Sequence, residues 1–413
     1  MVMWISSCVR ASLAGCGSLI GDEYIIWETG PNAAPCKSLG TVLLDWLWIV
    51  TNTETIIETP LASLHRATGA SMGTWFWCDL PDGWGDTREE QRFANEGVAL
   101  IDKNYRAYFG LAGPDRVRYL NAIVTTNIKD LDHGQGTISL LLNAQGRILA
   151  EIETFAGTDE VFCVSHRMIR ERLAEVLEKY IIMDDVTLTD KTENFGTLAL
   201  EGPAATELVR ELSGITLAEL PELEWREVRV GAIPCRLVKR SPAGISGAEF
   251  VAARGDLESL WSVLLQAVRK RGGGPMGYKA LSAQRLVQGT PWFGSDFGEK
   301  QIPHEAGLEL SHISYTKGCY TGQEIVERVR SRGQVNRRRV ELLFSGDGVP
   351  DSGTELTVDG KSVGFVTRAA QSWFPPAILG MGYVGKENRA LGTRLGWSGG
   401  AATVVEFKDT LQR

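Results

Sequence analysis

The 413-residue sequence lacks several features that would place it in a familiar class of protein. Its seven cysteines are scattered and include no Cys-x-x-Cys pair, which indicates a reducing cytoplasm and offers no cysteine-rich metal site. Its five histidines show no spacing typical of metal ligands, so we predict no metal. A net charge of −8 argues against the broad basic surface on which general nucleic-acid binders depend.

Long apolar runs are also missing. The stretch from Val42 to Val50 contains Asp45 and is too short to span a bilayer. Residues 13–16 are similar to a lipoprotein cleavage box, but Arg10 interrupts the apolar segment and no basic residue precedes it, which argues against a secretory signal. We therefore predict no membrane partner. Residues 1–58 are expected to be a poorly ordered extension. Alternatively, they result from an upstream translation start that the cell does not use.

With 413 residues, of which 43% are hydrophobic, the whole chain can bury a large core and form two or three domains. Residues 59–336 alternate between strand-like and helix-like patterns. Residues 337–413 instead carry short alternating strands, and Asp359-Gly360 is a strong two-residue hairpin signal. The pattern predicts an α+β fold that ends in a small β barrel or sandwich.

The most distinctive stretch is Lys317-Gly-Cys-Tyr-Thr-Gly-Gln-Glu324. Thr321 and Glu324 have the spacing of a capping box, so we predict that a helix starts there and ends at Gly333. Cys319 would then lie close to the positive end of that helix and to the Lys317 ammonium. Both favour a thiolate, so the pattern predicts a reactive cysteine with a lowered pKa.

A second interpretation of Cys319 fits the same residues equally well. A small cysteine in a tight turn flanked by glycines is often buried and inert. Reactive and structural cysteines differ in exposure, which a sequence does not show. The local chemistry therefore leaves both interpretations open.

Segment 317–324, followed by Arg328, Arg332 and Gly333, resembles the signature of the YgfZ-type folate-binding proteins, whose mitochondrial relatives assist the maturation of iron-sulfur enzymes. Residues 59–72 are similar to the start of the glycine-cleavage T-protein, an aminomethyltransferase related to the YgfZ type. Residues 303–308 add a further similarity. The resemblance covers roughly residues 59–385.

This resemblance implies a ring of three domains around a bound tetrahydrofolate or derivative. Two interleaved α/β subdomains would occupy residues 59–336, and a C-terminal β barrel would occupy residues 337–413. The cysteine-bearing segment would lie near the folate, with Tyr320, Gln323 and Glu324 completing the functional signature of Lys317 and Cys319. The implied partners are iron-sulfur client or assembly proteins, including tRNA-modifying enzymes, in the cytoplasm.

Two further residues are assigned to folate by the resemblance. Arg285 falls where T-proteins keep an arginine near the ligand, and a guanidinium suits a carboxylate-rich molecule. Glu249 lies in the segment that supplies an acid to the pterin, where it would accept hydrogen bonds from the amino-pyrimidine edge. The alternatives are a solvated helix residue for Arg285 and a surface strand residue for Glu249.

The departures from the T-protein pattern concern catalysis. The T-protein has a catalytic aspartate immediately before the position of Ile128, and this chain has Asn127 there. An amide does not take up a proton in the relevant pH range, which leaves enzymatic activity open. Ala150 and Val287 also stand where related proteins often have acidic residues.

An arginine-rich stretch extends from Arg328 to Arg339. It is suited to RNA, to a folate polyglutamate tail or to an acidic protein, although charge runs are more often solvated faces. Our first hypothesis is a YgfZ-type folate-binding protein that supports iron-sulfur enzymes. The alternatives are a folate-dependent aminomethyltransferase and a non-catalytic folate-sensing adaptor.

Overall fold

The computed structural model describes residues 56–241 and 243–407. Nearly all of the predicted extension lies outside these residues. Its last two members, however, form strand β1 (Ile57–Glu58), which pairs in parallel with β3 (Cys78–Gly83). The folded unit that begins at Ile56 therefore starts before the predicted boundary at Thr59.

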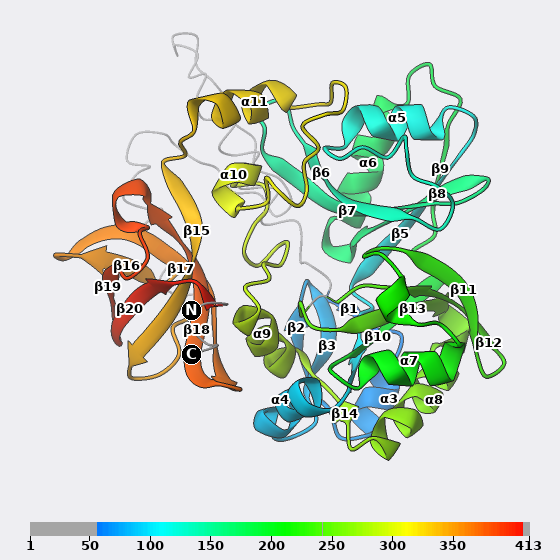
Figure 1. Ribbon diagram of the computed structural model, residues 1–413, viewed down its shortest axis with the longest axis horizontal. Coiled ribbons are helices and arrows are strands. Elements are labelled where there is room, and N and C mark those ends of the chain that lie inside the picture. The colour runs from blue at the N-terminus through cyan, green and yellow to red at the C-terminus, as the bar shows by residue number, and fades with distance from the viewer. Residues whose placement is uncertain (1–55, 242, 408–413) are drawn as a thin grey trace, which may run out of the picture. The chain divides into compact units, whose positions relative to one another are not determined.

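A five-stranded sheet with the order β6-β7-β8-β5-β9 forms one half of the α/β region (Figure 1). Helices α5 (Arg116–Ile123) and α6 (Arg170–Tyr180) pack on it through apolar side chains such as Leu120 and Leu173. The strands are β5 (Arg106–Ala112), β6 (Gly136–Leu142), β7 (Ile148–Ala156), β8 (Glu160–His166) and β9 (Thr187–Asp190).

A six-stranded sheet with the order β11-β12-β13-β10-β4-β14 forms the other half. Its core lies under α7 (Ala205–Ser213) and α8 (Leu257–Lys270), where Trp261 is buried. The strands are β4 (Ala99–Asp102), β10 (Phe195–Glu201), β11 (Trp225–Val230), β12 (Ile233–Val238), β13 (Gly247–Ala253) and β14 (Gly274–Pro275). Because β4 precedes the five-stranded sheet and β10 follows it, the two subdomains are interleaved, as predicted.

A short hairpin of β2 (Ser71–Trp75) and β3 precedes both sheets. Its turn residues Phe76 and Trp77 have φ angles of 52° and 59°, a left-handed conformation that disfavours large side chains by about 1–2 kcal/mol per residue. Phe76 offsets part of this strain by stacking on Tyr105, with 4.3 Å between ring centroids. Trp77 remains 46% exposed.

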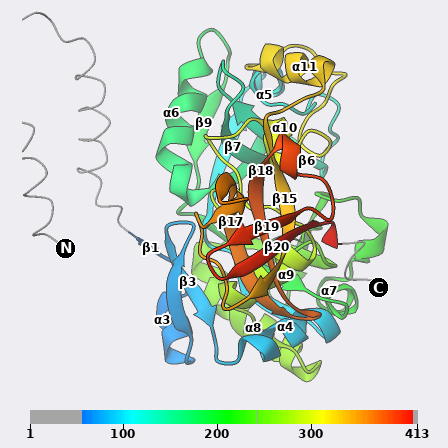
Figure 2. The same ribbon diagram turned by 90° about the vertical axis from the view of Figure 1, so that its left-hand side faces the viewer.

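The C-terminal region is a closed barrel with the order β15-β18-β17-β16-β19-β20, which confirms the predicted barrel (Figure 2). Asp359 and Gly360 form the expected hairpin turn between β16 and β17, both with positive φ. The strands are β15 (Arg337–Gly346), β16 (Glu355–Val358), β17 (Lys361–Trp373), β18 (Pro376–Gly385), β19 (Arg394–Trp397) and β20 (Gly400–Val405).

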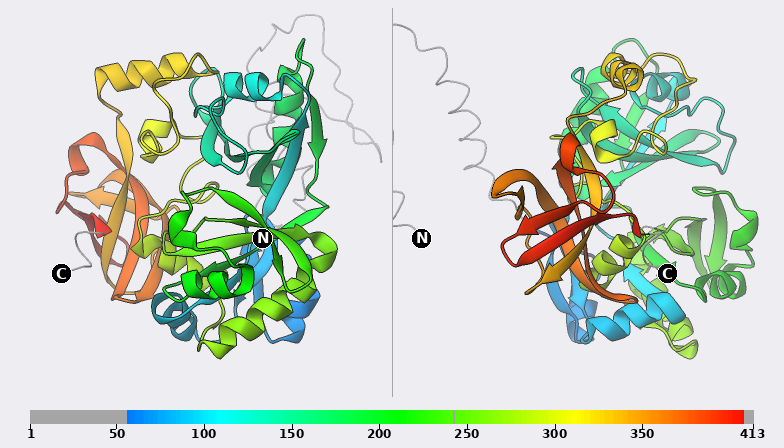
Figure 3. Two further views of the ribbon diagram at one scale, coloured as in Figure 1. Left: turned by 45° about the vertical axis from the view of Figure 1, so that its right-hand side comes forward. Right: turned by 60° about the vertical axis from the view of Figure 1, so that its left-hand side comes forward.

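Helix α9 (Tyr278–Val287) lies between β3 and the barrel strands β17 and β18 (Figure 3). The loop after it carries Asp296, which is buried and accepts hydrogen bonds from Trp292 N at 2.8 Å and Thr367 Oγ1 at 2.7 Å. Its carboxylate also pairs with Arg285. The shorter helices are α3 (Ala62–Ala67), α4 (Thr87–Glu96), α10 (Pro303–Ala306) and α11 (Gln323–Arg332).

We expect Asp296→Ala to lower the free energy of unfolding by about 3–5 kcal/mol, because it leaves the buried Arg285 charge without its counter-ion. Urea unfolding of the full-length protein measures this change. The exposed Asp347→Ala is the matched control and is expected to stay within about 0.5 kcal/mol. Equal stability of the two variants would contradict the inference that Asp296 connects Arg285 of helix α9 to Thr367 of the barrel.

Candidate functional site

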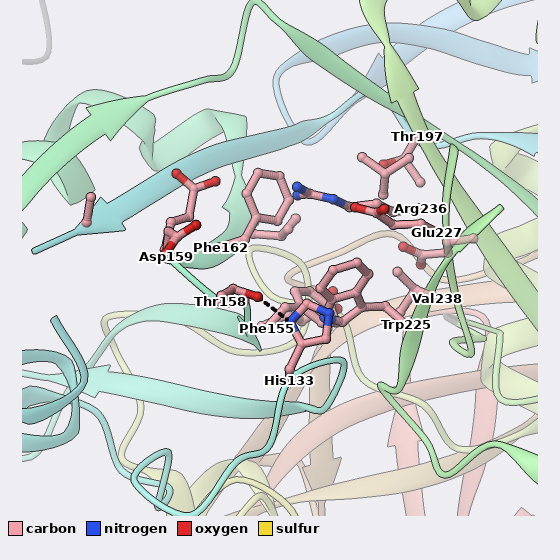
Figure 4. Close-up of a pocket in the computed structure, with 17 residues that line it drawn as sticks. His133, Phe155, Thr158, Asp159, Phe162, Thr197, Trp225, Glu227, Arg236 and Val238 are labelled. Carbon is pink, nitrogen blue, oxygen red and sulfur yellow. Dashed lines mark hydrogen bonds between the residues drawn. The ribbon is translucent and has the colours of Figure 1, made fainter. Parts of the chain in front are cut away.

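A cavity of about 410 Å³ lies between the two sheets (Figure 4). Strands β7 and β8 supply Phe155 and Phe162 from one sheet, and β11 and β12 supply Trp225 and Val238 from the other. These apolar side chains surround a space in which a few polar groups also face the interior. Such a combination is typical of a site for a small organic ligand.

Glu249 on β13 lines this cavity. Its Oε1 atom accepts hydrogen bonds from Lys103 Nζ at 2.5 Å and Arg106 Nη2 at 2.9 Å. Because both bonds end on Oε1, the Oε2 atom can accept a hydrogen bond from a ligand. The structure thus places the predicted pterin acid in a pocket wall, and the alternative of a surface strand residue is wrong.

Glu153 on β7 is a second carboxylate in the cavity wall. It accepts from Arg106 Nη1 at 2.7 Å and Arg240 Nε at 3.0 Å. Burial would raise the pKa of Glu153, but the charges of Arg106 and Arg240 outweigh it and hold that pKa at about 2. Burial lowers the pKa of Lys103 to about 8, with repulsion from Arg106 adding to the effect.

Arg236 is a cation on the cavity wall. Its guanidinium lies 4.8 Å from the ring centroid of Phe162 and 5.2 Å from that of Trp225. Within residues 56–241 and 243–407, its side chain makes no hydrogen bond or ion pair, so it is free to take an anionic group. At the rim, His133 Nδ1 and Thr158 Oγ1 lie 3.3 Å apart.

Arg285 is located elsewhere. Its side chain is fully buried in the pair with Asp296, donates to Thr290 O at 3.1 Å, and lies 4.7 Å from the Trp292 ring. Burial lowers its pKa, although Asp296 offsets part of that effect. The alternative of a solvated helix residue is therefore wrong, and the predicted folate contact stays a prediction.

Asn127 lies in the loop after α5. Its Nδ2 donates to Asp130 Oδ2 at 2.7 Å, and its Oδ1 accepts from Lys129 N at 3.0 Å. The amide thus stabilises its own turn through both of its ends. The ionisable group at this place in the fold is Asp130, which is exposed.

Lys317 connects the cysteine-bearing segment to this same loop. Its ammonium donates to the carbonyl oxygens of Asn121, Val124 and Thr126 at 2.6, 2.5 and 2.9 Å. An ammonium has three donors, so none remains for the Cys319 thiolate. The predicted activation of Cys319 by Lys317 is therefore not supported by the geometry, and Lys317 instead holds the segment in place. Burial lowers the pKa of this amine to about 8.

The predicted capping box at Thr321 and Glu324 is wrong. Helix α11 begins at Gln323, its N-cap is Gly322 with a φ of 83°, and no side chain caps it. A Cβ atom at Gly322 would lie 2.6 Å from the carbonyl oxygen of Asn143, so both the conformation and the packing require glycine. The predicted end of the helix at Gly333 is confirmed, with a φ of 71°.

Cys319 itself is exposed. The other described cysteines, Cys78, Cys163 and Cys235, are buried. Burial raises the pKa of Cys78 and Cys163 to about 12 and that of Cys235 to about 11. Exposure excludes the interpretation of Cys319 as a small buried cysteine. Next to it, the Tyr320 ring is buried, whereas Glu324 is exposed.

The last three arginines of the arginine-rich stretch are engaged with the chain itself, whereas Arg328, Arg330 and Arg332 are exposed. Arg337 pairs with Glu305 at 3.3 Å and Arg338 with Glu309 at 2.6 Å, and Arg339 donates to a backbone carbonyl. These internal contacts leave little of the 337–339 charge for RNA.

Sequence reasoning missed Lys103, Arg106, Glu153 and Arg236 as residues of the site. For Arg106, Glu153 and Arg236 the available signal was a charged residue within a largely apolar strand. Arg106 starts the buried strand β5, and Glu153 lies between the buried Ile152 and Thr154 on β7. A charge in such a position needs a partner, and the partners here come from distant parts of the chain.

Comparisons with known proteins agree with this architecture. Residues 61–313 match the GCVT N-terminal domain, and residues 337–403 match the glycine cleavage T-protein C-terminal barrel domain. The chain belongs to the glycine cleavage T-protein family. Among the described residues of this T-protein family member, no helix is long and apolar enough to cross a membrane, and no group of His, Cys, Asp or Glu is suited to a metal.

Curated relatives are similar to this chain in sequence, and a solved structure is similar to it in fold. An aminomethyltransferase of Herpetosiphon aurantiacus is 28% identical over 76% of this chain and 86% of its own length. One from Rubrobacter xylanophilus is 25% identical over 81% and 88%. The fold is similar to that of aminomethyltransferase T from Bartonella henselae, with a TM-score of 0.78, 22% identity, and coverage of 87% of this chain and 99% of that one.

We expect Lys317→Met to lower the free energy of unfolding by about 1–3 kcal/mol, because three partly buried backbone carbonyl groups would lose a charged donor. Urea unfolding measures the change. Lys129→Met, at an exposed position in the loop that Lys317 contacts, is the control and should leave stability within about 0.5 kcal/mol. A loss no larger than that of the control would show that the three bonds do not hold the segment.

Proposed function

We propose that this T-protein family member binds tetrahydrofolate in the cavity between its two sheets and acts as a folate-dependent protein of the aminomethyltransferase type. The observation that carries the proposal is Glu249, a carboxylate held in the cavity wall with one oxygen available to a ligand. The names of the relatives favour this function over the iron-sulfur role.

The chemistry of the cavity suits such a ligand. A carboxylate accepts hydrogen bonds from the amino-pyrimidine edge of a pterin, and the rings of Phe155, Phe162 and Trp225 offer apolar surface to its planar body. The unpaired guanidinium of Arg236 suits the carboxylates of a glutamate tail. The residues present therefore fit tetrahydrofolate, which would supply the one-carbon acceptor when bound.

Binding is tested by calorimetry with tetrahydrofolate. We expect micromolar affinity in the wild-type protein and a loss of about tenfold or more in Glu249→Gln, because the amide replaces the acceptor that faces the ligand. Val238→Phe, which fills the cavity instead, should weaken binding without disturbing the Lys103 and Arg106 contacts. Glu175→Gln on the exposed face of α6 is the control. Unchanged affinity in both cavity variants would exclude this binding site.

Turnover separates binding from aminomethyl transfer. Loss of an acid-base group costs on the order of 10² to 10⁴ in rate, so we expect slow transfer from a lipoyl carrier by the wild-type protein and faster transfer by Asn127→Asp. The new carboxylate would supply an ionisable group beside Asp130, whose Oδ2 atom accepts a hydrogen bond from the present amide nitrogen at 2.7 Å. Fast wild-type transfer with no gain in the variant would assign the proton to Asp130 or Asp132.

A second candidate function is the YgfZ-type support of iron-sulfur enzymes, and the exposure of Cys319 favours it. The segment that bears this thiol is held against the Asn127 loop by Lys317. An exposed thiol on a fixed segment suits exchange with a partner protein of the cytoplasm. This role is compatible with folate binding and does not need turnover.

We expect alkylation of the folded protein, followed by mass spectrometry, to label Cys319 well before Cys78, Cys163 and Cys235, because those three thiols are buried. Cys319→Ser should fold normally and bind folate, yet fail to restore iron-sulfur enzyme activity in cells that lack the protein. Cys235→Ser is the control for the cell assay. Full activity with Cys319→Ser would exclude the second candidate function.

A further inference from the structure

A second cavity, of about 220 Å³, lies where the β2–β3 hairpin, the loop after α9 and barrel strand β17 meet. It shares no lining residue with the cavity between the sheets. Four aromatic side chains and one arginine belong to its wall: Trp75, Phe76, Trp77, Trp292 and Arg368. We call this space the hairpin cavity.

The hairpin turn that lines this cavity is strained. Phe76 and Trp77 both have the left-handed backbone conformation that glycine or asparagine normally occupies in such a turn. Phe76 is packed against Tyr105 and Trp292, whereas Trp77 remains 46% exposed and gains little from burial. Strain of this kind persists at sites where the side chain has a use. The use that the structure offers Trp77 is to place an indole ring at the cavity.

Arg368 on β17 supplies an unpaired charge. Its guanidinium stacks 4.3 Å from the Trp75 ring, and among the described residues its side chain makes no hydrogen bond or ion pair. It is only half-buried, and burial lowers its pKa. The nearby Asp296 carboxylate is already engaged by Arg285, Thr367 and the amide of Trp292. An anion entering the cavity would therefore meet a guanidinium whose donors are free.

We propose that the hairpin cavity binds a small planar aromatic carboxylate. The ring would stack among the indole side chains, and the carboxylate would take two hydrogen bonds from Arg368. A neutral ring would lack the charged contact, and an aliphatic acid would lack the stacking. The site therefore distinguishes ligands by the combination of ring and charge, independently of folate.

Three probes test the two elements of this site separately in ligand-observed NMR titrations of the full-length protein. Benzoate carries both ring and charge, benzamide carries the ring alone, and acetate carries the charge alone. We expect benzoate to bind in roughly the millimolar range, as befits so small a ligand, and to bind at least about tenfold more tightly than either of the others. Equal binding of benzoate and benzamide, or no benzoate binding at about ten millimolar, would overturn the proposal.

Variants then locate the bound benzoate. Arg368→Gln should weaken binding by about tenfold or more, and Arg368→Lys should restore part of it. Arg236→Gln is the matched control, because Arg236 is the unpaired arginine of the other cavity. A loss of benzoate binding in Arg236→Gln with none in Arg368→Gln would overturn the assignment. Folate affinity should be unaffected by Arg368→Gln. A negative benzoate result would therefore not contradict the proposal that folate binds between the sheets.

Trp77→Gly tests the strained turn. We expect it to weaken benzoate binding about three- to tenfold while keeping or raising the melting temperature, because glycine adopts the left-handed conformation without strain. Trp373→Gly is the control, since Trp373 is 39% exposed and does not line the cavity. A merely structural role for Trp77 would instead give a lower melting temperature with unchanged benzoate binding, and that result would contradict the proposal.

Discussion

Arg106 is the residue on which the arrangement of the two sheets depends. It belongs to the five-stranded sheet and donates to Glu153 within that sheet and to Glu249 in the six-stranded sheet. Removing one partner of such a buried group costs about 3–5 kcal/mol, because the remaining charge has no counter-ion. The network therefore fixes the position of the two sheets relative to each other across the cavity. It also presents the Glu249 carboxylate to the space that a ligand would occupy, so stability and binding share the same residues.

Local patterns in the sequence predicted the elements well, because their causes are local. The helix end at Gly333 and the hairpin at Asp359-Gly360 follow from capping and turn chemistry, and both are present. The partners of buried charges could not be predicted in this way. Arg106 and Glu249 are 143 residues apart, and only the fold brings them together. The same reason explains why the sequence did not predict the pairing of Arg285 with Asp296, which the fold buries between helix α9 and the barrel.

The signature around Cys319 shows how a sequence motif can combine structural and functional residues. Gly322 is required by a positive φ and by the approach of the Asn143 carbonyl, and Lys317 is required by three carbonyl acceptors. Neither observation needs chemistry at the thiol. Cys319, by contrast, is exposed and has no such packing role in the turn. Folding therefore does not explain the thiol itself. Its presence favours a role in exchange with a partner protein, in addition to folate binding.

Arg236 and Arg368, the arginines of the two cavity walls, differ from the buried arginines in what they contact. Arg285 and Arg106 each pair with buried carboxylates, although the Nε atom of both and the Nη2 atom of Arg285 have no partner among the described residues. Arg236 and Arg368 lie over aromatic rings instead, each in the wall of a different cavity. Stacking on a ring desolvates one face of a guanidinium but leaves its N–H groups, which lie in the plane, without acceptors. Both cavities are thus suited to anions with a planar ring, and the strained Phe76-Trp77 turn gives the hairpin cavity its additional aromatic wall.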